Sequence, residues 1–223
     1  MSENIFSERS HALPRTVGDA LTLGVASALR ATWRLQGKRA LLTVGCMDTR
    51  KRYKGHDLVI QAVSRFVSAD YDVIRVMLGV DDRLDQIESA AVGLGVAGIA
   101  PVMDDVSLET QSDASDIFVI ASTDEGFGIP FLEAMACGTP ALGLATAGAK
   151  DALADGELGA AVDDGELADA LGDLLQAPRR DPHELEVAIC GRFGRRAFAD
   201  DVGMAMRRLF QLPLRLSVPI AEA

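Results

Sequence analysis

The sequence has few of the residues that mark a secreted, disulfide-stabilised or metal-binding protein. Its three cysteines, Cys46, Cys137 and Cys190, are odd in number and far apart, so they indicate neither a disulfide framework nor a metal knuckle. The first residues carry charges of both signs and no apolar core of a signal peptide. No run approaches the roughly 20 apolar residues that span a bilayer. We therefore expect a cytoplasmic protein with reduced thiols and no transmembrane segment.

Basic residues are also scarce. The chain has 22 Lys and Arg against 33 Asp and Glu, which gives a formal net charge of -11. That sign argues against a chain-wide surface for nucleic acid, although it is compatible with a local basic pocket. The Asp-Asp pairs at 81–82, 104–105 and 163–164 lack the spacing of a metal site, and we expect no metal. With 48% apolar residues, the 223 residues suffice for one sizeable globular domain.

Apolar periodicity predicts strands that alternate with helices of about ten residues. This alternation is typical of an α/β fold with a single Rossmann-like, doubly wound parallel sheet. We expect a linker-like segment at 1–36, one domain at 37–212 and a tail at 213–223. The predicted strands are 40–45, 73–79, 99–103, 117–122, 141–145 and 160–163. The predicted helices are 56–67, 82–94, 106–114, 131–137, 166–176 and 183–210, the last broken near Gly191 or Gly194.

One strand-to-helix turn carries the clearest chemical signal. The predicted strand ends at Ser122 and a helix begins near Gly128 or Ile129, with the turn Gly126-Phe127-Gly128 at the junction. Glycines let the backbone approach a ligand closely, and the N–H groups at a helix start favour an anion. Glu125 precedes the turn and Glu133 follows it. A carboxylate accepts two donors at once, which suits the hydroxyl groups of a sugar or ribose.

The run EGFGIPFLEAMACGTP, which begins at Glu125, resembles the signature of retaining GT-B glycosyltransferases, especially family 4. The resemblance implies that Glu125 contacts the donor sugar and that Glu133 binds the ribose of the nucleotide. It also implies that the backbone amides of Gly126, Phe127 and Gly128 meet the diphosphate. The alternative is an ordinary strand-loop-helix in which Glu133 is a surface residue.

A second run, LLTVGCMDTRKRYKGHDLVIQAV, resembles the first strand, phosphate-binding loop and helix of the same domain. The resemblance implies that Gly45 lines the nucleotide site and that Lys54 stabilises the leaving diphosphate. The family commonly has an arginine after the strand's glycine, and this sequence has Cys46 there. Loss of a guanidinium predicts weaker diphosphate binding. Arg50 is a candidate replacement, and a solvated basic loop is the equal alternative.

The resemblance extends over about residues 12–210, and all of it matches the nucleotide-sugar-binding half of a GT-B enzyme. The segment HALPRTVGDAL resembles the linker into that half. The implied activity is hexosyl transfer from a UDP- or GDP-sugar to an unknown acceptor, with retention and no cofactor, in polysaccharide or glycoconjugate synthesis. A separate acceptor-binding domain or chain is then the expected partner.

Two other interpretations remain. The first is a catalytically incomplete nucleotide-binding module, which Cys46 and the expected absence of an acceptor domain favour. The second is another Rossmann-like protein, such as a dehydrogenase or an epimerase. Its Gly-x-Gly-x-x-Gly fingerprint is missing after the first strand, where the sequence reads Gly45-Cys46-Met47-Asp48.

Overall fold

Six parallel strands form one sheet in the order β3-β2-β1-β4-β5-β6. This computed structural model describes residues 20–33, 35, 37–44, 55–67, 73–78, 84–96, 99–100, 108–178 and 181–211. The strand order is that of a Rossmann sheet, and it confirms the predicted fold class. The strands are β1 Arg39–Val44, β2 Val73–Leu78, β3 Ile99–Ala100, β4 Ile117–Ile120, β5 Ala141–Leu144 and β6 Ala160–Val162.

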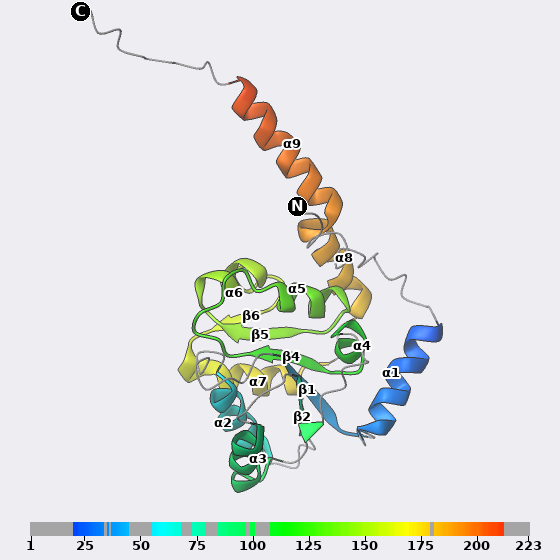
Figure 1. Ribbon diagram of the computed structural model, residues 1–223, viewed down its shortest axis with the longest axis vertical. Helices are drawn as coiled ribbons and strands as arrows, with labels where there is room; N and C mark the ends of the chain where they lie inside the picture. Colours follow the sequence, from blue (N-terminus) through cyan, green and yellow to red (C-terminus); the bar gives the residue numbers. More distant parts are fainter. Residues whose placement is uncertain are drawn as a thin grey trace, which may run out of the picture.

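Helices cover both faces of this sheet (Figure 1). Side chains alternate along each strand, so Phe118 and Ile120 of β4 belong to one apolar cluster and Ile117 and Val119 to the other. One cluster includes helices α1, α5, α6 and α8, and the other includes α2, α3 and α7. The helices are α1 Ala20–Thr32, α2 His56–Val67, α3 Leu84–Gly93, α4 Leu108–Asp113, α5 Ile129–Ala136, α6 Ala147–Ala152, α7 Leu167–Gln176, α8 Pro182–Phe193 and α9 Arg195–Gln211.

The strand order reverses between β1 and β4, which are hydrogen-bonded neighbours in the sheet. Ligands of doubly wound sheets bind beyond the carboxyl ends of the strands at such a reversal. On this edge, Gly55 at the start of α2 lies against the end of β4. A Cβ on Gly55 would come within 2.6 Å of the carbonyl carbon of Ala121, and its φ of +69° favours glycine as well.

The opposite edge of the sheet is held together by a buried carboxylate. Asp116, whose side chain is 3% exposed, accepts hydrogen bonds from the N–H of Ala40 at 2.9 Å and from Arg30 at 3.2 Å. Arg39 lies 3.5 Å from the same carboxylate. Arg30 belongs to α1, a helix where the sequence predicted no element. These contacts fix α1 and the starts of β1 and β4 relative to one another.

The C-terminal helical region is divided at Gly194, one of the two positions predicted for a break. After this break α9 projects away from the sheet (Figure 1), and its side chains are largely exposed. Among the residues that the structure describes, no helix combines the length and apolar character needed to cross a membrane.

Candidate functional site

The turn between β4 and α5, residues 121–128, lies at the edge of the sheet where a ligand is expected. Ala121 and Ser122 follow β4 and are buried. The hydroxyl of Ser122 has no hydrogen-bond partner among the described residues. Gly128 then takes a left-handed conformation, with φ 75° and ψ 34°, and caps α5. A side chain would be strained there, which explains a glycine at this position.

The structure places five of the predicted site residues on this one strand-loop-helix unit. Glu125 is half-buried before the turn, and Gly126 and Phe127 are exposed within it. Glu133 is half-buried in the second turn of α5. The other predicted site residues, Gly45, Arg50 and Lys54, lie outside the described residues, as does Cys46.

The backbone of the turn offers donors for an anion. The N–H groups of Gly126, Phe127 and Gly128 donate no hydrogen bond to other described residues. Pro130 in the first turn of α5 has no N–H, and the N–H of Phe131 already donates to the carbonyl of Gly128 at 3.0 Å. Residues 126–128 thus present three adjacent N–H donors beside the positive end of the α5 dipole.

Helix α6 packs directly against this turn. A Cβ on Gly148 would meet the carbonyl oxygens of Glu125 and Gly126, and would lie 2.5 Å from the carbonyl carbon of Gly126. A Cβ on Gly128 would lie 3.0 Å from Cβ of Ala152, also in α6. Because the backbone of Gly148 lies directly against the backbone of Glu125 and Gly126, α6 limits the path of the turn. The sequence did not connect Gly148 with the turn, because this residue lies outside the strand-turn-helix motif.

The side chain of Phe127 points toward a different helix. Its ring lies 6.5 Å from that of Phe193 in α8, in an edge-to-face arrangement with an interplanar angle of 81°. Phe127 remains 48% exposed. Phe193 is a second residue that the sequence did not connect with the site, since α8 follows the motif by more than forty residues.

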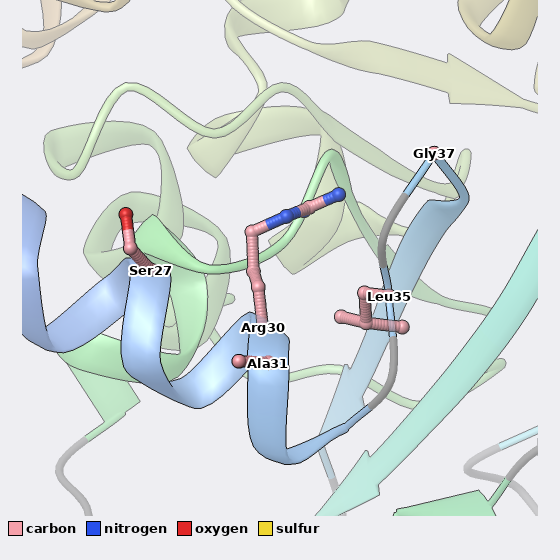
Figure 2. A pocket seen from close by; sticks show the side chains of 5 residues that line it. All are labelled: Ser27, Arg30, Ala31, Leu35 and Gly37. Carbon is pink, nitrogen blue, oxygen red and sulfur yellow. The ribbon is translucent and has the colours of Figure 1, made fainter.

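A hollow of about 240 Å³ lies elsewhere, beside α1 and the entry to β1. Figure 2 shows Arg30 rising between Ser27 and Leu35 in this hollow. The guanidinium donates to the carbonyls of Ala114 at 2.7 Å and Lys38 at 2.9 Å, so it stabilises the fold. No predicted site residue lines this hollow. Within the described part of the chain, no group of three or more His, Cys, Asp or Glu is arranged to hold a metal.

The family model described as "Glycosyl transferases group 1" matches residues 30–189. A D-inositol 3-phosphate glycosyltransferase of Arthrobacter sp. is 31% identical over 185 residues, which cover 80% of this chain and 42% of that protein. A GDP-mannose-dependent alpha-(1-6)-phosphatidylinositol monomannoside mannosyltransferase of Mycolicibacterium smegmatis is 31% identical over 150 residues, covering 61% and 39%.

Among solved structures, Anabaena Alr3699/HepE in complex with UDP and glucose is similar, with a TM-score of 0.68 and 18% identity. The match covers 83% of this chain and 52% of that one. At this identity the likeness concerns the fold. The chain thus spans about half of this solved structure and about two fifths of the two relatives.

Proposed function

This chain belongs to the group 1 glycosyl transferases, and from that premise we propose that it is the donor-binding half of a retaining GT-B enzyme of family 4. Its ligand would be a nucleoside diphosphate sugar, either UDP- or GDP-linked. One observation carries the proposal. The motif from Glu125 to Glu133 forms the turn at the carboxyl end of β4, beside the reversal of strand order.

The turn supports diphosphate binding through its backbone. The N–H groups of residues 126–128 are available to an anion, and the start of α5 adds its positive dipole end. The buried hydroxyl of Ser122, which has no partner among the described residues, is a further polar group at this edge. Because buried polar atoms are nearly always paired, a ligand at this position would satisfy it.

In the reaction we propose, the bond between the anomeric carbon and the diphosphate breaks, and a bond from an acceptor hydroxyl forms on the same face. Glu125 would orient the sugar hydroxyls, and Glu133 would accept hydrogen bonds from the ribose. The departing diphosphate gains negative charge, which the amides at 126–128 and the ammonium of Lys54 would stabilise. The proton of the acceptor hydroxyl leaves with the diphosphate. We propose that no metal or cofactor takes part.

We propose that a separate domain or chain supplies the acceptor site. The two matched relatives are more than twice as long as the parts of them that align with this chain. The names of two matched proteins mention different nucleotides, GDP in one and UDP in the other. Both nucleotides are therefore to be tested. We also propose a cytoplasmic location, which is supported by three cysteines whose spacing does not suggest disulfide pairs.

Calorimetric titration of the chain with UDP and with GDP tests this proposal. Glu133→Gln should weaken binding about 10- to 100-fold, since a hydrogen bond to a charged group contributes about 1.5–3 kcal/mol. Glu184→Gln is the matched control, because Glu184 is an exposed glutamate in the first turn of α8. The proposal fails if the unaltered chain binds neither nucleotide at millimolar concentration, or if the two variants behave alike.

A nucleotide-binding module without transferase activity is the second candidate, and Cys46 favours it. A thiol at the family's usual arginine position removes five hydrogen-bond donors and a positive charge. Cys46→Arg should strengthen UDP or GDP binding if the site is otherwise that of the family. An unchanged affinity would favour the module over the enzyme.

A further inference from the structure

Helix α8 lies along α5 and contacts it near both ends. At one end, a Cβ on Gly138 after α5 would come within 2.7 Å of Cα of Pro182, the first residue of α8. At the other end, Phe193 in the last turn of α8 meets Phe127, two residues before α5. The two helices are therefore antiparallel. Leu185 and Ile189 of α8 lie between these ends, in the same apolar cluster as the buried side chains of α5.

Phe193 is held in place from two directions. It is half-buried and packs against the apolar cluster. The guanidinium carbon of its neighbour Arg192 lies 5.8 Å from the centroid of the Phe193 ring, a distance at which a cation and an aromatic ring attract each other. Arg192 also forms an ion pair of 2.8 Å with Glu157, which lies between α6 and β6. The partly buried ring of Phe193 thus meets Phe127 with support from the apolar cluster and from Arg192.

Phe127 carries the only side chain in the Gly-Phe-Gly turn. A Cβ on Gly126 would meet nothing within 4 Å, so this part of the turn has no side-chain packing of its own. The backbone contact with Gly148 limits movement toward α6. The contact between Phe127 and Phe193 holds the turn from the side of α8. Without it, the turn would be ordered by the backbone contact with Gly148 and by the packing of Gly128 against Phe131 and Ala152.

We infer that Phe193 is a positioning residue of the donor site, which acts through Phe127 to hold the amides of residues 126–128 in the geometry that binds a diphosphate. This inference rests on the proposed function. It adds α8, which follows the motif by more than forty residues, to the determinants of nucleotide affinity. Phe193 itself does not contact the ligand. Its ring restricts the positions that the turn can adopt before the nucleotide arrives, which lowers the entropic cost of binding.

The test uses calorimetric titration with UDP and GDP, together with the ¹⁵N relaxation order parameters of the amides at 126–128 in the chain without nucleotide. Phe193→Ala should weaken nucleotide binding about two- to tenfold, the factor that corresponds to one edge-to-face aromatic pair. Phe193→Tyr keeps an aromatic ring and should bind nucleotide with the affinity of the unaltered chain. Phe198→Ala is the matched control, because Phe198 lies in α9 and is 69% exposed. It should bind like the unaltered chain.

A double-mutant cycle separates positioning from a general loss of stability. Phe127→Ala alone should weaken binding by a similar factor, and Phe193→Ala should then have no further effect in the Phe127→Ala chain. A full effect of Phe193→Ala in that background would overturn the inference, as would an unchanged affinity of the single variant. If Phe193→Ala does not fold, Phe127→Ala alone still tests whether loss of the aromatic contact weakens nucleotide binding.

The order parameters of these amides distinguish failure of this inference from failure of the proposed function. If the unaltered chain binds neither nucleotide, the proposed function fails. The positioning inference then fails with it as a statement about a donor site. If the chain binds nucleotide but the order parameters at 126–128 are equal in Phe193→Ala and Phe198→Ala, the donor site stands and the positioning role is wrong. The expected result is that the order parameters fall from about 0.85 toward 0.6 in Phe193→Ala alone.

Discussion

Gly148→Ala is the substitution that tests most sharply whether α6 fixes the turn before α5. The added methyl would lie 2.5 Å from the carbonyl carbon of Gly126, and it would also meet the carbonyl oxygens of Glu125 and Gly126. All three atoms belong to the backbone, so no side chain can rotate away. The turn or α6 must move by at least about 0.9 Å to restore an ordinary contact of 3.4 Å.

Two energetic effects of Gly148→Ala oppose each other. Overpacking a close contact costs about 1–3 kcal/mol. Alanine instead of glycine within a helix contributes about 0.8–1.0 kcal/mol of stability. We therefore expect the free energy of unfolding to fall by about 0–2 kcal/mol. The effect on binding should be larger, because the contact displaces the N–H donors themselves. A misplacement of about 1 Å can reduce catalytic function about 100-fold, and we expect nucleotide affinity to fall at least about tenfold.

Gly191→Ala is the matched control for Gly148→Ala. A Cβ on Gly191 would meet nothing within 4 Å, and the residue lies inside α8. This variant should be more stable than the unaltered chain by about 1 kcal/mol and should bind nucleotide normally. Urea unfolding measures the stability of both variants, and calorimetry with UDP and GDP measures their affinity. Equal affinities for the two variants would refute the reasoning that α6 sets the path of the turn.

Three further predictions concern stability and thiol chemistry. Asp116→Ala should lower the free energy of unfolding, measured in urea, by about 2–4 kcal/mol, because it removes a buried hydrogen-bond acceptor. Asp169→Ala is the control and should change this free energy by less than about 1 kcal/mol, because the Asp169 side chain in its ion pair is 84% exposed. Asp155→Gly should raise the urea midpoint, because Asp155 has φ 51°, a conformation that costs a side chain about 1–2 kcal/mol. Burial, and after it the charge of Glu186, raises the pKa of the Cys190 thiol, so less thiolate is present at pH 8. Alkylation of Cys190 by iodoacetamide should therefore be slower than in the urea-unfolded chain, and Glu186→Gln should accelerate it.

Much of the fold could be predicted, because apolar periodicity is a local property of the sequence. Helix α2 has the predicted bounds, since its apolar residues recur at helical spacing. Helices α1 and α6 were missed for different reasons. The sequence of α1, ALTLGVASALRAT, is rich in small and apolar residues and has little contrast between its faces. Helix α6 has six residues, which is too short for a period to be detected.

The candidate site could be predicted only where its residues are contiguous. The motif from Glu125 to Glu133 is a single strand-loop-helix, and its local pattern indicated the turn and the start of α5. The contacts that hold this turn come from Gly148 and Phe193, which are distant in sequence. Nothing local marks either residue, because a glycine at a backbone contact and an aromatic residue near a helix end are both common. Tertiary packing gives them their role.

The central claim is that the amides of the turn before α5 bind the diphosphate of a nucleotide. The most direct measurement follows the amide ¹⁵N and ¹H resonances of Gly126, Phe127 and Gly128 while UDP or GDP is added to the chain. Saturable shifts at these three amides, with Gly191 in α8 as an unaffected reference, are the predicted result. Saturable binding that leaves these three amides unshifted, or no shift anywhere at millimolar nucleotide, would contradict the account.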